Sequence, residues 1–155
     1  MPDGYRERVA ARAIVFDKNG HIALQHITKR NYHKLPGGGV EAGEDIAMGL
    51  TRELAEEIGC VVEEVRDLGV VEEFRDKQGL HQVSHCFVAS VAGEKDVPNP
   101  DEGEVADGAE AVWMTLESAT QTLEDEVARV ENYTEKFMCL RDLTFLREAK
   151  RISGS

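Results

Sequence analysis

Three glutamates and a run of glycines lie close together in the first half of the chain and could bind a metal ion. Glu53, Glu56 and Glu57 are spaced i, i+3, i+4, which places their side chains on one arc of a helix. Like charges at this spacing repel one another, and a divalent cation would convert that repulsion into binding. Oxygen ligands without His or Cys suit Mg²⁺ or Mn²⁺ rather than zinc. The alternative is a solvated helix face with no metal.

The glycines at 37–39 precede this helix and let the backbone approach a ligand closely. A helix is expected over 45–58, with Gly59 as its left-handed C-cap. Its core-facing side is formed by Ala47, Leu50, Leu54 and Ile58. Gly49 falls within the arc of the glutamates, where we expect it to leave room above the carboxylates.

The other elements are expected to hold this segment in a single domain of α/β (α+β) class spanning 1–155. Two strands flank an Asn-Gly turn, further strands follow the helix, and two helices end the chain. Strands are expected at 8–16, 21–27, 61–74, 80–92 and 111–114, helices at 116–128 and 131–149, a loop at 28–44 and a mobile acidic loop at 93–109.

The chain has 155 residues and a formal net charge of −12, from 30 acidic and 18 basic side chains. This charge argues against a protein that grips a nucleic-acid polymer with a basic face, and against binding to an anionic membrane surface. A small anionic substrate remains compatible, because a cation or backbone N–H groups can hold it locally.

Three cysteines, Cys60, Cys86 and Cys139, show neither zinc-ligand spacing nor a disulfide framework. We expect buried free thiols in a reducing compartment. No signal peptide and no membrane-spanning run is apparent in the sequence, so a cytoplasmic protein is expected.

The glycine and glutamate pattern resembles the Nudix box. Five residues separate Gly38 from Glu44, and seven more lead to Arg52 and the run that ends at Gly59. All seven invariant positions of the box match: Gly38, Glu44, Arg52, Glu53, Glu56, Glu57 and Gly59. Cys60 replaces the bulky aliphatic residue that closes the box. The resemblance implies a Nudix-type α/β/α sandwich around a mixed β-sheet.

The same resemblance implies hydrolysis of a nucleoside diphosphate linked to another group, with Mg²⁺ as cofactor and Mn²⁺ as a substitute. Glu56 and Glu57 would be metal ligands, and Glu53 a ligand or a base that orients the attacking water. A carbonyl of Gly37 or Gly38 would complete the ligand set. Glu44 and Arg52 would support the carboxylates. Substrate contacts would come from Gly37, Gly38, Gly39, Arg30 and Lys34.

Some Nudix relatives supply a further catalytic carboxylate from a late loop. The candidates are Glu94, Asp96, Asp101, Glu102 and Glu104. Of these we favour Glu102 or Glu104, and the alternative is a mobile acidic loop without a catalytic role.

Several other side chains have both a functional and a structural interpretation. Arg30, Lys34 and Arg75 could bind phosphate or be ordinary exposed charges. His81 and His85 share one strand face by their even spacing. Tyr32 and Phe74 could stack on a base or pack in the protein, and Trp113 is expected in the core.

Two residues that mark particular substrate classes in Nudix relatives are absent from this sequence. Relatives that hydrolyse ADP-ribose carry a proline soon after the box, and relatives that hydrolyse dinucleoside polyphosphates carry a tyrosine slightly further on. Here that region reads Phe74-Arg75-Asp76-Lys77-Gln78. A MutT-like nucleoside triphosphate pyrophosphohydrolase is therefore favoured. The alternatives are hydrolysis of ADP-ribose, a sugar nucleotide or a dinucleoside polyphosphate, or a nucleotide sensor without turnover. A homodimer is left open, since relatives are often dimers.

Overall fold

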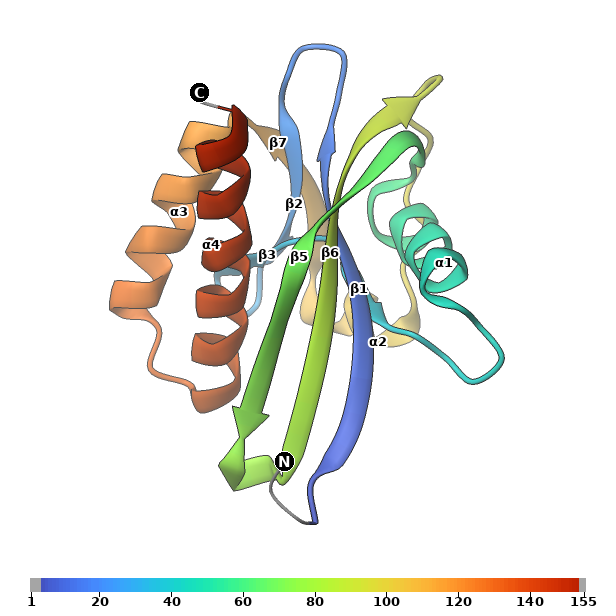
Figure 1. Cartoon of the computed structure of the whole chain (residues 1–155). Coiled ribbons are helices and arrows are strands. Elements are labelled where there is room, and N and C mark those ends of the chain that lie inside the picture. The colour runs from blue at the N-terminus through green and yellow to red at the C-terminus, as the bar shows by residue number, and fades with distance from the viewer. Residues whose placement is uncertain (1–3, 154–155) are drawn as a thin grey trace.

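A computed structural model describes residues 4–153 and shows a seven-stranded sheet with helices on both faces (Figure 1). The strands are β1 (Arg6–Phe16), β2 (Ile22–Ile27), β3 (Tyr32–Lys34), β4 (Gly37–Gly39), β5 (Val61–Arg75), β6 (Leu80–Ala92) and β7 (Ala109–Met114). The helices are α1 (Ile46–Ile58), α2 (Glu102–Asp107), α3 (Leu116–Arg129) and α4 (Tyr133–Ser153), and a 3₁₀ turn spans Asp76–Gln78.

The sheet is mixed and is centred on β1. Its strands run in the order β3-β2-β1-β6-β5, with β4 also paired to β1 and β7 to β2. β1 and β6 are parallel from the pair Arg6 and Leu80 to the pair Phe16 and Ser90, and the other pairs are antiparallel. The short β4 therefore hydrogen-bonds directly to the central strand.

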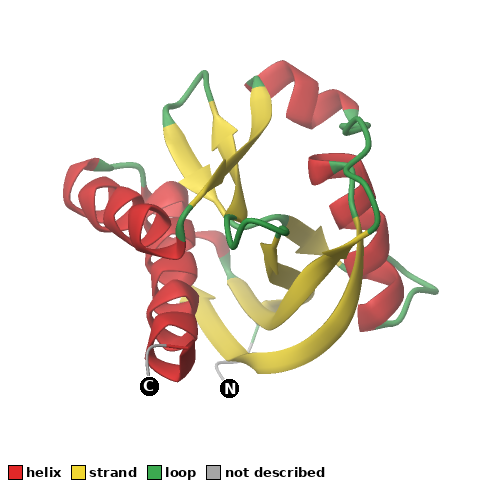
Figure 2. Ribbon diagram, turned by 90° about the horizontal axis from the view of Figure 1, so that it is seen from above, coloured by secondary structure: helices red, strands yellow, loops and turns green. Residues whose placement is uncertain are grey.

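The side chains of β1 alternate between two apolar layers. Ile14 packs with residues of α3 and α4, including Leu123 and Leu146. Val15 faces the opposite way and packs with Leu54 of α1. Figure 2 shows α3 and α4 on one side of the strands and α1 on the other. The expected Nudix-type α/β/α sandwich around a mixed β-sheet is thus confirmed.

The predicted helix at 45–58 is confirmed as α1. Asp45 caps its N-terminus by accepting a hydrogen bond from the Met48 N–H at 2.8 Å, and Gly59 ends it with a φ of 64°. The expected core position of Ala47 is wrong, because this side chain is exposed near the start of the helix.

The room beside Gly49 is filled by the loop that precedes α1. This residue is buried, and a Cβ there would lie 3.2 Å from Cγ2 of Val40 and 3.4 Å from Glu44 Oε1. Gly49 therefore lets the loop that carries Glu44 pack closely on α1.

Two segments expected to be loops contain regular structure. The 28–44 segment holds β3 and β4, and the 93–109 segment holds α2 and the start of β7. The acidic segment is also attached to α1, because the Asp96 N–H donates to the Gly59 carbonyl at 2.7 Å and the Asn99 N–H to the Glu56 carbonyl at 2.8 Å. The segment expected to be a mobile loop is therefore hydrogen-bonded to the end of α1.

The three cysteines are free and buried, as expected. Within residues 4–153, no helix combines the length and the apolar composition that a membrane crossing requires.

Candidate metal centre and substrate cleft

The carboxylates of α1 pack directly against the glycine strand β4. The Gly37 N–H donates to Glu57 Oε1 at 2.8 Å. A Cβ on Gly38 would lie 2.6 Å from Glu53 Oε1, and one on Gly37 would lie 2.2 Å from the Ala11 carbonyl oxygen. Glycine is therefore required at Gly37, where the clash is with the backbone of β1, and at Gly38 any larger residue would displace the Glu53 carboxylate.

A carboxylate from the late acidic segment joins this group. Oxygens of Glu53, Glu57 and Glu104 all lie within 4.8 Å of one another, and so do oxygens of Glu56, Asp101 and Glu104. Among the residues of chain segment 4–153, Glu102 belongs to neither set. Of the two favoured late carboxylates, Glu104 is the one that the fold brings to the glutamates of α1.

The position of Glu104 follows from the geometry at the start of α2. Asp101 is the N-cap, and its side chain accepts a hydrogen bond from the Glu104 N–H at 2.8 Å. The Glu104 carboxylate reaches back to the Asp101 N–H at 2.9 Å, which completes a capping box. The same carboxylate thus fixes the short helix and faces the glutamates of α1.

The carboxylates repel one another strongly in this arrangement. Burial raises the pKa of Glu57 well above its ordinary value, and its contact with Glu104 adds to this rise. Burial and the neighbouring charge of Glu53 also raise the pKa of Glu56. Such a set of oxygen ligands with excess negative charge fits a hard divalent cation such as Mg²⁺ or Mn²⁺.

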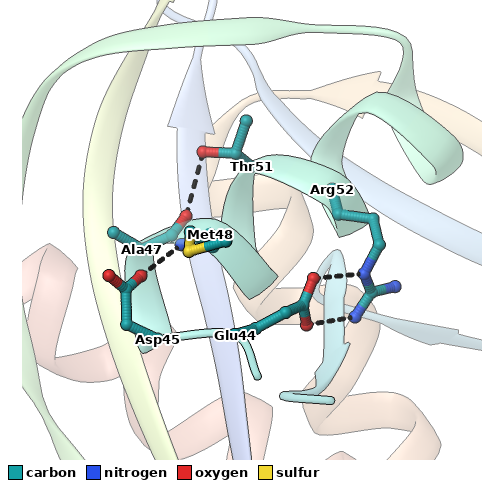
Figure 3. Close-up of a pocket in the computed structure, with 6 residues that line it drawn as sticks. All are labelled: Glu44, Asp45, Ala47, Met48, Thr51 and Arg52. Atoms are coloured by element: carbon teal, nitrogen blue, oxygen red, sulfur yellow. Dashed lines mark hydrogen bonds and ion pairs between the residues drawn. The ribbon is translucent and has the colours of Figure 1, made fainter. Parts of the chain in front are cut away.

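Arg52 connects α1 to the preceding loop (Figure 3). Its guanidinium donates to Glu44 Oε2 at 2.8 Å and to Oε1 at 3.0 Å, a bidentate pair that faces solvent in the surface pocket drawn there. It also donates to Glu53 Oε1 at 3.0 Å and to the Gly39 carbonyl at 3.1 Å. The contact with Arg52 lowers the pKa of Glu44. This geometry fits the expected supporting roles of Glu44 and Arg52.

The cationic residues expected to touch the substrate lie in different surroundings. Lys34 is near enough to Glu57 to oppose the rise in the pKa of that carboxyl. Arg30 donates instead to Glu135 of α4 at 2.7 Å. Arg75 is buried and donates to Glu73 at 2.6 Å, so it is neither exposed nor unpaired.

The aromatic residues that could stack on a base or pack in the protein also lie in different surroundings. Tyr32 is buried in a small apolar cluster, whereas Phe74 stacks on His81 with ring centroids 4.5 Å apart. His85 is half-buried in the middle of β6. Trp113 is half-buried rather than fully in the core, and Lys95 Nζ lies 3.7 Å from the centre of its ring.

A cleft of about 460 Å³ adjoins the metal centre and was not expected from the sequence. It is lined by Gln25, Glu57, Ile58, Lys95, Asp96, Pro98, Pro100, Ala109, Glu110, Ala111 and Trp113. Gln25 is the residue that sequence reasoning missed here. The available signal was a pair of polar residues, Gln25 and His26, in the otherwise apolar strand Ile22–Ile27, which periodicity alone does not distinguish from an edge position.

A family model described as the NUDIX domain matches residues 6–137 of the chain. No curated protein matches it. The fold is similar to a NUDIX hydrolase from Nitrosomonas europaea, at a TM-score of 0.64 and 18% identity over 88% of each chain.

Two MutT structures are also similar. One, described for Aliivibrio salmonicida and Vibrio cholerae, has a TM-score of 0.55 and 20% identity, covering 74% of this chain and 82% of the other. The second, a MutT NUDIX hydrolase from Burkholderia pseudomallei, has a TM-score of 0.55 and 28% identity, covering 72% of this chain and 85% of the other.

Proposed function

Because the chain belongs to the NUDIX domain family and is a Nudix hydrolase of nucleoside diphosphate derivatives, we propose that its substrate is an unmodified or oxidised (deoxy)nucleoside triphosphate. The α–β anhydride is hydrolysed to give a nucleoside monophosphate and pyrophosphate. Mg²⁺ is the cofactor, and Mn²⁺ can replace it. The observation that carries metal-dependent hydrolysis is the convergence of Glu53, Glu57 and Glu104 beside the glycine strand.

Different glutamates have different roles in the proposed reaction. Glu56 and Glu57 would hold the cation, together with a carbonyl of Gly37 or Gly38. A bound Mg²⁺ would neutralise charge on the phosphates and lower the pKa of a coordinated water. Glu53 binds the cation or orients the attacking water.

Arg52 keeps the carboxylates in register by linking Glu53 to Glu44 and to the backbone of β4. Such contacts behind a ligand orient it and tune its affinity for the metal. Phosphate oxygens would meet the exposed edge of Gly38 and Gly39 and the ammonium of Lys34.

The preference for a triphosphate is supported by two further points. The segment after the box lacks the proline and the tyrosine expected of ADP-ribose and dinucleoside polyphosphate hydrolases. Two of the similar structures are MutT proteins. The net charge of −12 is consistent with a small nucleotide as partner rather than a nucleic-acid polymer or a membrane. A cytoplasmic location and a homodimer belong to the same proposal.

A hydrolysis screen tests this function directly. Purified protein is incubated with Mg²⁺ and with unmodified and oxidised nucleoside triphosphates, ADP-ribose, sugar nucleotides and dinucleoside polyphosphates. Pyrophosphate and phosphate are measured separately. We expect pyrophosphate from one or more triphosphates, little free phosphate, and loss of turnover when EDTA removes the metal.

Two results would overturn the proposal. Faster turnover of ADP-ribose, a sugar nucleotide or a dinucleoside polyphosphate would reassign the substrate. Calorimetric binding of a triphosphate without any product after long incubation in Mg²⁺ would identify a sensor.

A further inference from the structure

The cleft beside the metal centre contains a buried hydrogen-bonding group with no partner. Gln25 is 1% exposed, and its Oε1 has no hydrogen-bond partner among residues 4–153. It projects from β2 on the side of the sheet that carries α1 and lines the cleft. A buried acceptor left unpaired is costly to the fold, so its retention indicates a ligand that donates to it.

The other polar groups of the cleft are also mainly acceptors. Glu57, Asp96 and Glu110 line it, and Lys95 is its one cation among the described residues. The Lys95 ammonium is already engaged, because it donates to Asp17 at 2.9 Å and lies over the Trp113 ring. This charge distribution disfavours phosphate groups in the cleft and favours a neutral group that carries N–H donors.

The remaining walls suit a flat apolar body. Trp113 and Ala111 come from β7, which pairs with β2 beside Gln25, while Pro98 and Pro100 come from the loop attached to α1. Ile58 of α1 adds a further apolar side chain to the lining. Aromatic and proline surfaces around a few fixed hydrogen-bonding groups are the usual lining of a site for a heterocyclic ligand.

Glu57 links this cleft to the metal centre. It is 4% exposed, lines the cleft, and has a carboxylate oxygen within 4.8 Å of oxygens of Glu53 and Glu104. A nucleotide whose phosphates are held by the cation therefore has its base within reach of Gln25.

Resting on the proposed function, we propose that this cleft binds the nucleobase of the substrate and that Gln25 Oε1 accepts a hydrogen bond from its exocyclic amino group. Adenine and cytosine carry such a donor where hypoxanthine and uracil carry a carbonyl oxygen. The substrate class is thus a nucleotide with an amino-bearing base. A base with an oxo group at the same position would place its carbonyl oxygen against Gln25 Oε1, and two acceptors cannot form a hydrogen bond.

Matched pairs of nucleoside monophosphates test this inference by calorimetry in Mg²⁺. AMP and IMP differ in the group at C6 and in the adjacent N1, CMP and UMP differ in the group at C4 and in the adjacent N3, and none contains an anhydride to hydrolyse. We expect the wild-type protein to bind the amino-bearing member of at least one pair about tenfold more tightly than its oxo counterpart. Equal affinity for both members of both pairs would overturn the inference.

A variant pair assigns the preference to Gln25. Gln25→Met keeps the length of the side chain but removes the acceptor, and we expect it to abolish the preference within either pair. Gln121→Met is the matched control, since Gln121 is exposed on α3 and bonds only to Asp125 in the described structure. Thermal unfolding of both variants establishes that they are folded. A preserved preference in folded Gln25→Met would contradict the assignment.

The binding experiment and the hydrolysis screen fail separately. An amino-base preference without turnover of any triphosphate would leave the base site standing and overturn the proposed function. Pyrophosphate release without any base preference would support the proposed function and overturn the base site.

Discussion

Two groups of buried charged side chains lie on opposite faces of the sheet and differ in their charge balance. On the α4 face, Glu73 and Asp142 pair with Arg75 and Arg141, a further arginine, Arg12, is buried beside them, and all five are at most 6% exposed. Arg141 donates to Asp142 at 2.8 Å and to Glu73 at 3.2 Å. On the α1 face, the carboxylates of Glu53, Glu57 and Glu104 meet with only peripheral cations.

The protonation behaviour of the two groups differs accordingly. Burial lowers the pKa of Arg141, but its contacts with Asp142 and Glu73 outweigh this and raise it. The pKa of Glu57 is instead raised by burial and by another carboxylate. Carboxylates that are balanced by buried arginines need no cation, whereas carboxylates that meet one another gain stability when a cation binds. The balance of carboxylates by arginines therefore separates the structural cluster from the functional one.

Breaking the balanced cluster should have the largest effect. Asp142→Ala leaves Arg141 without its closest partner and the Leu35 N–H without its acceptor, which lies at 3.0 Å. We expect the free energy of unfolding, measured by urea denaturation, to fall by about 3–5 kcal/mol. The exposed Asp125→Ala on α3 should change it by less than about 0.5 kcal/mol. Similar losses in both variants would refute a structural role for the charge balance.

Removing one charge from the unbalanced cluster should cost activity without costing stability. In Glu57→Gln, the amide oxygen can still accept from the Gly37 N–H, but the charge that would hold the proposed cation is lost. We expect kcat to fall by at least about 10²-fold, with thermal stability unchanged or increased. The exposed Glu63→Gln on β5 serves as the control. Near-normal turnover in Glu57→Gln would remove this residue from the metal centre.

The smallest expected effect distinguishes two neighbouring residues of α2. Glu104→Gln should weaken Mg²⁺ binding roughly tenfold, read as a shift in the Mg²⁺ concentration that stabilises the protein against thermal unfolding. Glu102→Gln should leave that concentration unchanged, because Glu102 is in neither carboxylate set of residues 4–153. Equal behaviour of the two variants would mean that α2 contributes nothing to the metal centre.

The parts of the fold that depend on local signals could be predicted. The cap at Asp45 and the left-handed Gly59 place both ends of α1 within one residue of the expected bounds. The short strand β4 could not be predicted, because three glycines carry no side-chain periodicity and pair with β1 only through their backbone. The close packing of Gly49 on Val40 could not be predicted either, because Val40 lies outside the helix and approaches only in the folded chain.

In the site, too, features that depend on local spacing could be predicted, and features that depend on distant segments could not. The spacing of the box places Glu53 and Glu57 in one carboxylate set and Glu56 in the neighbouring one, and Arg52 pairs with Glu44. The sequence narrowed the late carboxylate to two residues but could not choose between them. That choice depends on contacts between distant segments, and so does the cleft around Gln25, which draws on β2, β7, α1 and the loop before α2.

The attachment of the acidic loop to Gly59 has a consequence for motion. A Cβ on Gly59 would lie 2.2 Å from the Asp96 carbonyl oxygen, and Asp96 and Asn99 donate to the carbonyls at the end of α1. The cleft wall and the last turn of the helix are therefore expected to open as one cooperative unit of local unfolding. A ligand that holds the loop closed also suppresses fraying of the turn that carries Glu56 and Glu57. Occupancy of the cleft would in this way be transmitted to the order of the metal ligands.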